Sequence, residues 1–161
     1  MDRESLLMMK YFIVNYLKDL DGSAVLDIGS ARIEGNDQPE ETYRDLFKKR
    51  FAYFGMDLTP GGNVDVVGYE NIKCRFDVVV SGQVMEHVKR PWEWLKNLVQ
   101  YSKRFICIVA PWKFPEHNYP IDTYRYLPAG MRDLFDFAGI KELEIFKKEQ
   151  HTIGIGEVYG C

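Results

Sequence analysis

The sequence predicts an α/β protein: a three-layer sandwich around a seven-stranded, mostly parallel sheet that closes with a C-terminal antiparallel hairpin. Three observations lead to this fold class. Short apolar runs with the length of buried strands alternate with stretches of helical periodicity. Turn residues follow several of these runs, and two strand-like segments end the chain with no helix between them. The 161 residues are enough for one such domain.

The N-terminal segment predicts a helix followed by a buried strand. Apolar residues recur every three or four positions across residues 5–20, and Gly22 then ends the helix. Residues 24–28 form a short apolar run that enters the turn Gly29-Ser30. This combination is typical of a buried parallel strand.

The next segment predicts a second helix and two short strands. Pro39 is followed by two glutamates, which is the chemistry of a helix opening. Strands are expected at residues 51–56 and 64–67, because a turn cluster of Thr, Pro and Gly at residues 59–62 separates them.

Residues 76–80 are the clearest buried strand, because three valines follow one another before Ser81-Gly82. A helix with one apolar face begins near Pro91. A fifth strand at residues 105–109 stops at Pro111. The alternation favours parallel strands whose carboxyl ends meet at one edge, where such sheets bind ligands.

The last segments predict a short helix at residues 131–138, which ends at Gly139, and a hairpin of residues 141–148 and 152–159. We expect a single domain, 1–161, in four parts. They are an N-terminal helix (1–22), a ligand-binding core (23–110), an aromatic, proline-rich loop of the kind that often carries function (111–128) and a closing helix with strands (129–161).

Composition argues against several classes of function. The formal net charge of -3 offers no dominant basic face, so no nucleic-acid partner is expected. Cys74, Cys107 and Cys161 are far apart and lack metal-ligand spacing, which disfavours a disulfide framework or a zinc site and favours a cytoplasmic protein. Neither a signal peptide nor membrane insertion is expected, because no apolar run has the required length.

Acidic residues and a glycine stand at the ends of the first two predicted strands. Asp27 precedes Gly29, whose missing side chain lets the backbone approach a ligand, although this pattern alone is equally typical of an ordinary turn. Asp57 ends the next strand, where a carboxylate can accept both hydroxyls of a ribose. The Gly-x-Gly-x-x-Gly turn that binds a diphosphate is missing, so an NAD-dependent oxidoreductase is an alternative of lower rank.

Three motifs stand out at the predicted strand ends: Val-Leu-Asp-Ile-Gly-Ser at 25–30, Phe-Gly-Met-Asp at 54–57 and Phe-Asp-Val-Val-Val-Ser-Gly-Gln-Val-Met-Glu-His at 76–87. Together they resemble class I S-adenosylmethionine-dependent methyltransferases that act on small molecules. The resemblance covers roughly residues 20–130 and implies a Rossmann-like fold with S-adenosylmethionine as the methyl donor. One departure is Ala31, where the family usually has a second glycine.

Further positions narrow the resemblance. They are Tyr43-Arg44, residues 59–65, Glu116-His117, Pro120, Asp122 and Arg125. They resemble a bacterial subgroup that is often associated with sugar and surface-polysaccharide pathways. This implies, by association, a sugar or glycan precursor as the small-molecule acceptor.

The resemblance also implies a set of donor-binding residues. Asp27, Gly29 and Ser30 would lie at the methionine part, Asp57 at the ribose, Leu58 at the adenine face, Asp65 and Val66 at the adenine edge, and Ser81 and Gln83 beside the sulfonium. Arg44 could pair with the donor carboxylate because a guanidinium matches that planar anion, or it could be a solvated surface charge.

The loop 111–128 supplies the acceptor-side candidates. His117 and Asp122 could remove a hydroxyl proton, and Arg125 could bind an anionic group. The alternative is that Asp122 and Arg125 form an ion pair that braces the loop, with His117 capping it. A metal site of His117 and Asp122 lacks a clear third ligand, so no metal is expected.

Three more residues are expected to bind substrate: Trp112 and Tyr119 in the loop, and His87, which the resemblance implies shapes the pocket. The favoured function is in-line methyl transfer to a small molecule. The alternative from another class is a donor-binding but catalytically degenerate scaffold domain. The sequence leaves the oligomeric state open.

Overall fold

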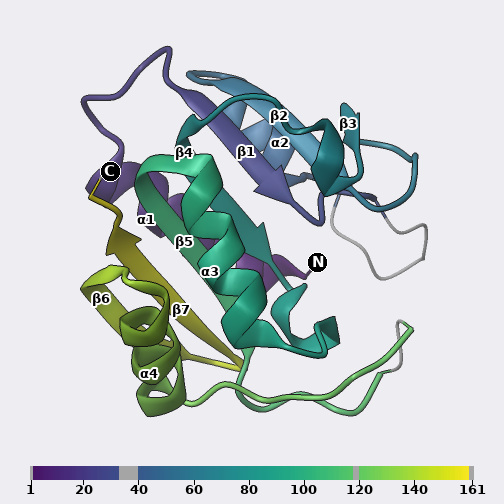
Figure 1. Cartoon of the computed structure of the whole chain (residues 1–161), viewed down its shortest axis with the longest axis vertical. Helices are drawn as coiled ribbons and strands as arrows, with labels where there is room; N and C mark the ends of the chain where they lie inside the picture. Colours follow the sequence, from purple (N-terminus) through teal and green to yellow (C-terminus); the bar gives the residue numbers. More distant parts are fainter. Residues whose placement is uncertain (1, 33–39, 118–119, 160–161) are drawn as a thin grey trace.

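The computed structural model describes residues 2–32, 40–117 and 120–159 (Figure 1). The strands are β1 (Ala24–Ile28), β2 (Ala52–Asp57), β3 (Val66–Val67), β4 (Phe76–Gly82), β5 (Ser102–Pro111), β6 (Lys141–Lys148) and β7 (His151–Glu157). The helices are α1 (Arg3–Tyr16), α2 (Tyr43–Phe47), α3 (Pro91–Tyr101) and α4 (Pro128–Ala138), with two short 3-10 helices, η1 (Tyr69–Asn71) and η2 (Met85–His87).

These strands form one seven-stranded sheet in the order β3-β2-β1-β4-β5-β7-β6. The first five strands of this order pair in parallel, whereas β7 pairs antiparallel with both β5 and β6. The predicted α/β fold class, with its mostly parallel sheet and C-terminal antiparallel hairpin, is confirmed.

Helices cover both faces of the sheet. α3 and α4 lie over one face, and α1 and α2 lie behind it on the other (Figure 1). Because side chains alternate along a strand, Leu26 and Ile28 pack toward α3 and α4 while Val25 packs toward α1 and α2. Two apolar cores result, one on each face. Within the described ranges, no helix is long and apolar enough to cross a membrane.

α1 is shorter than predicted, and side chains form hydrogen bonds with backbone groups at its start and just beyond its end. Asp2 caps the first turn by accepting from the backbone N–H of Ser5 at 2.8 Å. The helix ends at Tyr16, and the predicted end at residue 20 is wrong. Arg50 donates to the carbonyl of Lys18 at 2.7 Å, which satisfies a backbone acceptor outside any helix.

α2 begins at Tyr43; the predicted opening at Pro39 lies outside the described residues. Thr42 and Asp45 form a capping box that defines this start. The backbone N–H of Asp45 donates to the Thr42 hydroxyl at 3.4 Å, and the Asp45 carboxylate accepts from the backbone N–H of Thr42 at 3.1 Å.

β5 is longer than predicted because two neighbours pair along it. It starts directly after α3, with Ser102 opposite Phe76 of β4, and ends with Pro111 opposite His151 of β7. α4 also starts early, at Pro128, because proline suits the first position of a helix. It ends as predicted at Gly139, which adopts the left-handed conformation with φ 74°.

The packing of α4 on β7 yields a stability prediction. A Cβ on Gly154 would lie 2.7 Å from Phe135 Cζ and 3.0 Å from Met131 Cγ. The side chains of α4 therefore pack directly against the backbone of β7 at this glycine. We expect Gly154→Ala to lower the free energy of unfolding by about 1–3 kcal/mol through overpacking. Urea denaturation measures this change.

The matched control is Gly130→Ala in α4, where an added Cβ meets nothing within 4 Å. This substitution should raise the free energy of unfolding by up to about 1 kcal/mol, because alanine favours a helix. Equal effects of the two substitutions would contradict the proposed packing.

Candidate functional site

The carboxyl ends of β1, β2 and β4 meet at one edge of the sheet. The chain runs from β1 to β2 and β3 on one side and returns to β4 on the other side, so the strand order reverses between β1 and β4. Open α/β sheets bind ligands at such a switch point. Ser81, buried near the end of β4, donates to the carbonyl of Ile28 at 2.7 Å and ties the two strand ends together.

The turn after β1 requires a glycine. Gly29 has φ 80°, and a Cβ at this position would lie only 2.1 Å from Val84 Cγ2. The next residue, Ser30, is buried and donates from its hydroxyl to the carbonyl of Asn63 at 3.1 Å. The turn is therefore fixed against the segment that follows β4 and against the loop before β3.

Asp57 ties the end of β2 to the turn after β1. Its Oδ2 accepts from the backbone N–H of Ala31 at 3.0 Å and its Oδ1 from that of Leu58 at 2.7 Å. The carboxylate is half-buried and each oxygen keeps a second lone pair. The Leu58 side chain beside it is 68% exposed. An anionic acceptor and an apolar surface therefore stand next to each other.

Asp27 is a buried carboxyl group in the middle of this edge. Its Oδ2 accepts from the Tyr53 hydroxyl at 2.6 Å, and its residue is only 4% exposed. Burial raises the pKa of Asp27 to about 7, although the Tyr53 hydrogen bond acts in the opposite direction. Asp27 therefore changes its charge near neutral pH.

Arg44 forms an internal ion pair. Its guanidinium pairs with Asp65, donates to the carbonyl of Asn63 at 3.0 Å and stacks over the Tyr53 ring at 4.8 Å. Asp65 also accepts from the backbone N–H of Gly55 at 2.8 Å. Arg44 is therefore held by the protein and we do not retain it as the partner of a donor carboxylate.

Val66, expected at the adenine edge, lies half-buried at the start of β3.

Gln83, expected beside the sulfonium, adopts a left-handed backbone conformation with φ 58°. Its amide donates to Asp2 Oδ2 at 2.6 Å. The same Asp2 oxygen lies 2.7 Å from Nε2 of His151, a fully buried residue at the start of β7. Gln83 therefore belongs to a network that joins α1 to the sheet edge.

In the loop after β5, Asp122 and Arg125 brace each other. Both Arg125 terminal nitrogens donate to the Asp122 carboxylate, at 2.5 and 2.7 Å, and the backbone N–H of His117 adds a third bond at 2.7 Å. The hydrogen bonds from Arg125 hold the pKa of Asp122 well below its usual range. Asp122 is therefore a poor proton acceptor, and we do not retain it as a catalytic base.

The guanidinium of Arg125 is likewise engaged in hydrogen bonds within the protein. Besides Asp122, its guanidinium donates to the carbonyls of Phe114 and Pro115, each at 3.1 Å. The structure corresponds to the loop-bracing alternative, so we do not retain Arg125 as an anion ligand.

Trp112 lies at the rim of an open depression of about 650 Å³ on the loop side. The depression is lined by Trp112, Lys113, Phe114, Pro115, Arg125, Glu149 and Gln150. The Trp112 indole N–H donates to the carbonyl of Glu149 at 2.8 Å, and its ring carries the ammonium of Lys147 at 4.1 Å. Tyr119, the other aromatic residue expected to bind substrate, lies outside the described residues.

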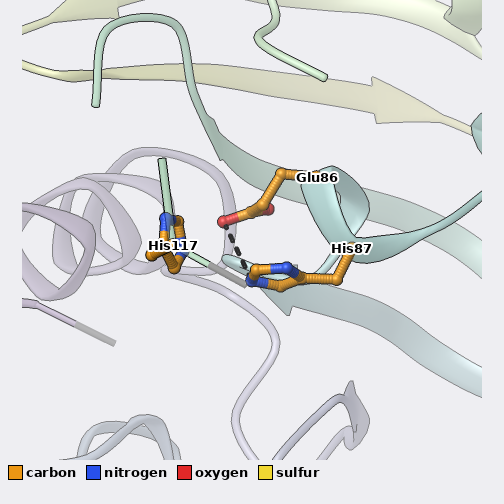
Figure 2. A group of neighbouring side chains, drawn as sticks. All are labelled: Glu86, His87 and His117. Carbon is orange, nitrogen blue, oxygen red and sulfur yellow. Dashed lines mark ion pairs between the residues drawn. The ribbon is translucent and has the colours of Figure 1, made fainter. Parts of the chain in front are cut away.

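A second group of polar side chains gathers between η2 and this loop. Figure 2 shows Glu86 and His87 from η2 turned toward His117 from the loop. One potential ligand atom from each of the three lies within 4.8 Å of the others. Sequence reasoning did not bring them together: Glu86 and His87 were visible as a motif, but their contact with His117 depends on the path of the loop.

Glu86 is the most unusual member of this group. Its residue is 1% exposed, and within the described part of the chain neither carboxylate oxygen has a hydrogen-bond partner. Burial raises the pKa of Glu86 to about 7 and lowers that of His87. A buried carboxyl without partners is costly, and such a group is a common mark of a functional site.

No family model and no curated protein matches the chain. Solved structures do match it in fold. A chain from the complex of the Haloferax volcanii Trm112 methyltransferase activator with a methyltransferase is 14% identical, with a TM-score of 0.68 over 95% of this chain and 89% of that one. Magnesium protoporphyrin IX methyltransferase from Synechocystis PCC 6803, with bound S-adenosylmethionine, is 12% identical, with a TM-score of 0.64 over 96% and 77%.

A further neighbour, the [4+2]-cyclase SpnF, is 10% identical and has a TM-score of 0.67 over 96% of this chain and 81% of that one. The chain therefore has the Rossmann-like fold of class I methyltransferases. The cyclase also shows that this fold alone does not determine the reaction.

The buried Asp27 yields a prediction for the pH dependence of stability. Its folded pKa of about 7 exceeds the ordinary aspartate value of 3.8, so the folded state holds this proton more tightly than the unfolded state. The associated stability is fully present below pH 3.8 and is lost as the pH rises through 7. The difference corresponds to about 4 kcal/mol at 1.36 kcal/mol for each pH unit.

Asp27→Asn removes this titration. We therefore expect the free energy of unfolding of the variant, measured relative to that of the wild type, to increase as the pH rises from 4 to 8. Denaturant titrations of both proteins at several pH values measure the difference. Parallel stability curves for the two proteins would contradict the assignment.

Proposed function

We propose that this chain is an S-adenosylmethionine-dependent methyltransferase that acts on a small molecule by in-line methyl transfer, with a sugar or glycan precursor as the preferred class of acceptor. The observation that supports it most is the switch point between β1 and β4. There a glycine with positive φ, a half-buried acid at the end of β2 and an exposed leucine occupy one sheet edge.

The described residues fit the donor chemically. Asp57 offers free lone pairs for the ribose hydroxyls, and exposed Leu58 offers an apolar face for the adenine. In this proposal Gly29, Ser30 and Asp27 would bind the methionine part, Asp65 and Val66 the adenine, and Ser81 and Gln83 would lie at the reacting end. Bound there, the donor supplies a methyl group already activated by its sulfonium.

The acceptor side is the loop after β5. Phe114 packs its ring edge-on against His117 at 5.1 Å, and Trp112 borders the open depression beside it. His87 and Trp112 remain candidates for acceptor binding, and Tyr119 belongs to the same loop. The Asp122–Arg125 pair keeps this loop in place, which orients an acceptor and excludes water.

The two alternatives differ in what supports them. Dinucleotide-binding Rossmann domains have a parallel sixth strand, whereas here an antiparallel β7 stands between β5 and β6, which disfavours the NAD-dependent oxidoreductase. The scaffold alternative has a specific observation in its favour, because Asp122 and Arg125 are occupied by each other. An activity assay separates this alternative from the enzyme.

Donor binding is the first test. Calorimetry should show one molecule of S-adenosylhomocysteine bound for each chain and no binding of NAD. Gly29→Ala should weaken the binding at least about tenfold, because the added methyl group is strained at positive φ and collides with Val84.

Gly61→Ala is the matched control in the neighbouring turn, since a Cβ there makes only an ordinary contact, 3.8 Å from the Ala31 Cβ. It should leave the affinity for S-adenosylhomocysteine unchanged. Thermal melting of both variants checks that they fold. Unchanged affinity in folded Gly29→Ala would place the donor elsewhere.

Methyl transfer is the second test. The protein is incubated with donor labelled on its methyl group and with a panel of sugar nucleotides, followed by cell extract, and the labelled product is identified by mass spectrometry. We expect label in a small molecule. Label only in protein or nucleic acid would contradict the acceptor class, and donor binding without any transfer would favour the scaffold.

A further inference from the structure

Glu86, His87 and His117 form a cluster of which the methyl-transfer proposal uses only His87, as a candidate for acceptor binding. The two histidines contact each other edge-to-face with ring centroids 4.9 Å apart, and His87 Nε2 lies 3.8 Å from Glu86 Oε1 (Figure 2). Two imidazoles and one carboxylate, contributed by η2 and the loop after β5, therefore bring potential ligand atoms within 4.8 Å of one another.

Hydrogen bonds determine which nitrogen of each histidine is free. His87 Nδ1 lies 2.5 Å from the carbonyl oxygen of Ile121, which can only accept, so Nδ1 carries the proton. His117 Nδ1 lies 3.1 Å from the carbonyl oxygen of Pro115 and 3.3 Å from Asp122 Oδ2. The tautomer that these carbonyl oxygens select has its lone pair on Nε2 in each ring.

This arrangement is the one that metal-binding histidines use. A ligating histidine almost always donates its other ring N–H to a carbonyl or a carboxylate, which fixes the ring and its tautomer. Here Ile121 provides the carbonyl for His87, and Pro115 with Asp122 provides the acceptors for His117. The bidentate bond from Arg125 holds Asp122 in turn.

Glu86 supplies the independent observation that points to a ligand. Within the described residues, both of its oxygens are buried and lack a hydrogen-bond partner. Proteins rarely keep such oxygens without a hydrogen bond, a counter-charge or a cation. In the described part of the chain the guanidinium of Arg125 donates to Asp122 and to backbone carbonyls and forms no hydrogen bond with Glu86, so the Glu86 carboxylate is available to a cation from outside the chain.

We propose that Glu86, His87 and His117 bind one divalent transition-metal ion of the zinc class. Two imidazole nitrogens and one carboxylate suit zinc, iron or cobalt, whereas magnesium and calcium prefer oxygen ligands alone. Because the potential ligand atoms already lie within 4.8 Å of one another, shifts of less than about 1 Å bring each within about 2.1 Å of a common ion.

Three protein ligands leave a position for water or a substrate atom, as in catalytic zinc sites. The side chain of His117 is 37% exposed, so this position is reachable from the loop side. The site extends beyond the proposed methyl transfer and does not depend on it, because metal binding requires neither the donor nor an acceptor.

The test uses the full chain after removal of metals with a chelator. Co²⁺ is titrated and its visible d–d absorption is followed, and Zn²⁺ binding is measured by calorimetry. We expect one ion for each chain. Glu86→Gln and His117→Gln should each weaken binding at least about tenfold, in the range by which disturbed metal sites lose affinity.

His151→Gln is the control, because it removes the remaining histidine of the chain, which lies outside the cluster. It should leave Co²⁺ affinity unchanged. Zn²⁺ should raise the melting temperature of the wild type and of His151→Gln, but not of the two ligand variants.

Absence of Co²⁺ absorption and of Zn²⁺ heat in the wild type would overturn the proposal. Wild-type affinity in folded His117→Gln would also overturn it. This variant decides the question even where Glu86→Gln does not fold, because His117 stands on a partly exposed loop.

Discussion

The close packing of Gly29 against Val84 fixes how near the turn after β1 lies to the segment that follows β4. A side chain on the turn after β1 would collide with Val84, so the turn lies directly against the segment that follows β4. That segment continues into η2, which carries Glu86 and His87. The turn after β1 and the polar cluster are consequently parts of one packed unit, and neither can move outward without opening this contact.

The sheet was predictable because buried strands are short, apolar and bounded by turns, and all the predicted strands have counterparts. The ends of helices and strands were not predictable where residues distant in the sequence determine them. α1 stops at Tyr16 while the helical pattern of the sequence continues, and Arg50, 32 residues beyond Lys18, takes the Lys18 carbonyl. β5 extends to Ser102 because β4 pairs with it there. Local periodicity carries no information on such contacts.

The position of a residue was predictable where it follows from the end of a buried strand, as for Gly29 after β1 and Asp57 at the end of β2. The role of a residue was not predictable where it depends on which partner a side chain finds. Arg44 and Arg125 each have the chemistry to bind an anion, but the fold gives them Asp65 and Asp122. Such pairs depend on the tertiary structure and not on the local sequence. The same is true of the proximity of His117 to Glu86.

Asp2 has a consequence beyond the helix that it caps. One carboxylate caps α1, accepts from Gln83 and contacts His151, so the start of the chain is attached to the edge of the sheet where β4 ends and β7 begins. Burial raises the pKa of Asp2, but the bonds from His151 and Ser5 outweigh it and lower the pKa to about 2, so the attachment persists in mild acid. A change at Asp2 would therefore be felt at Gln83 and His151, where β4 ends and β7 begins.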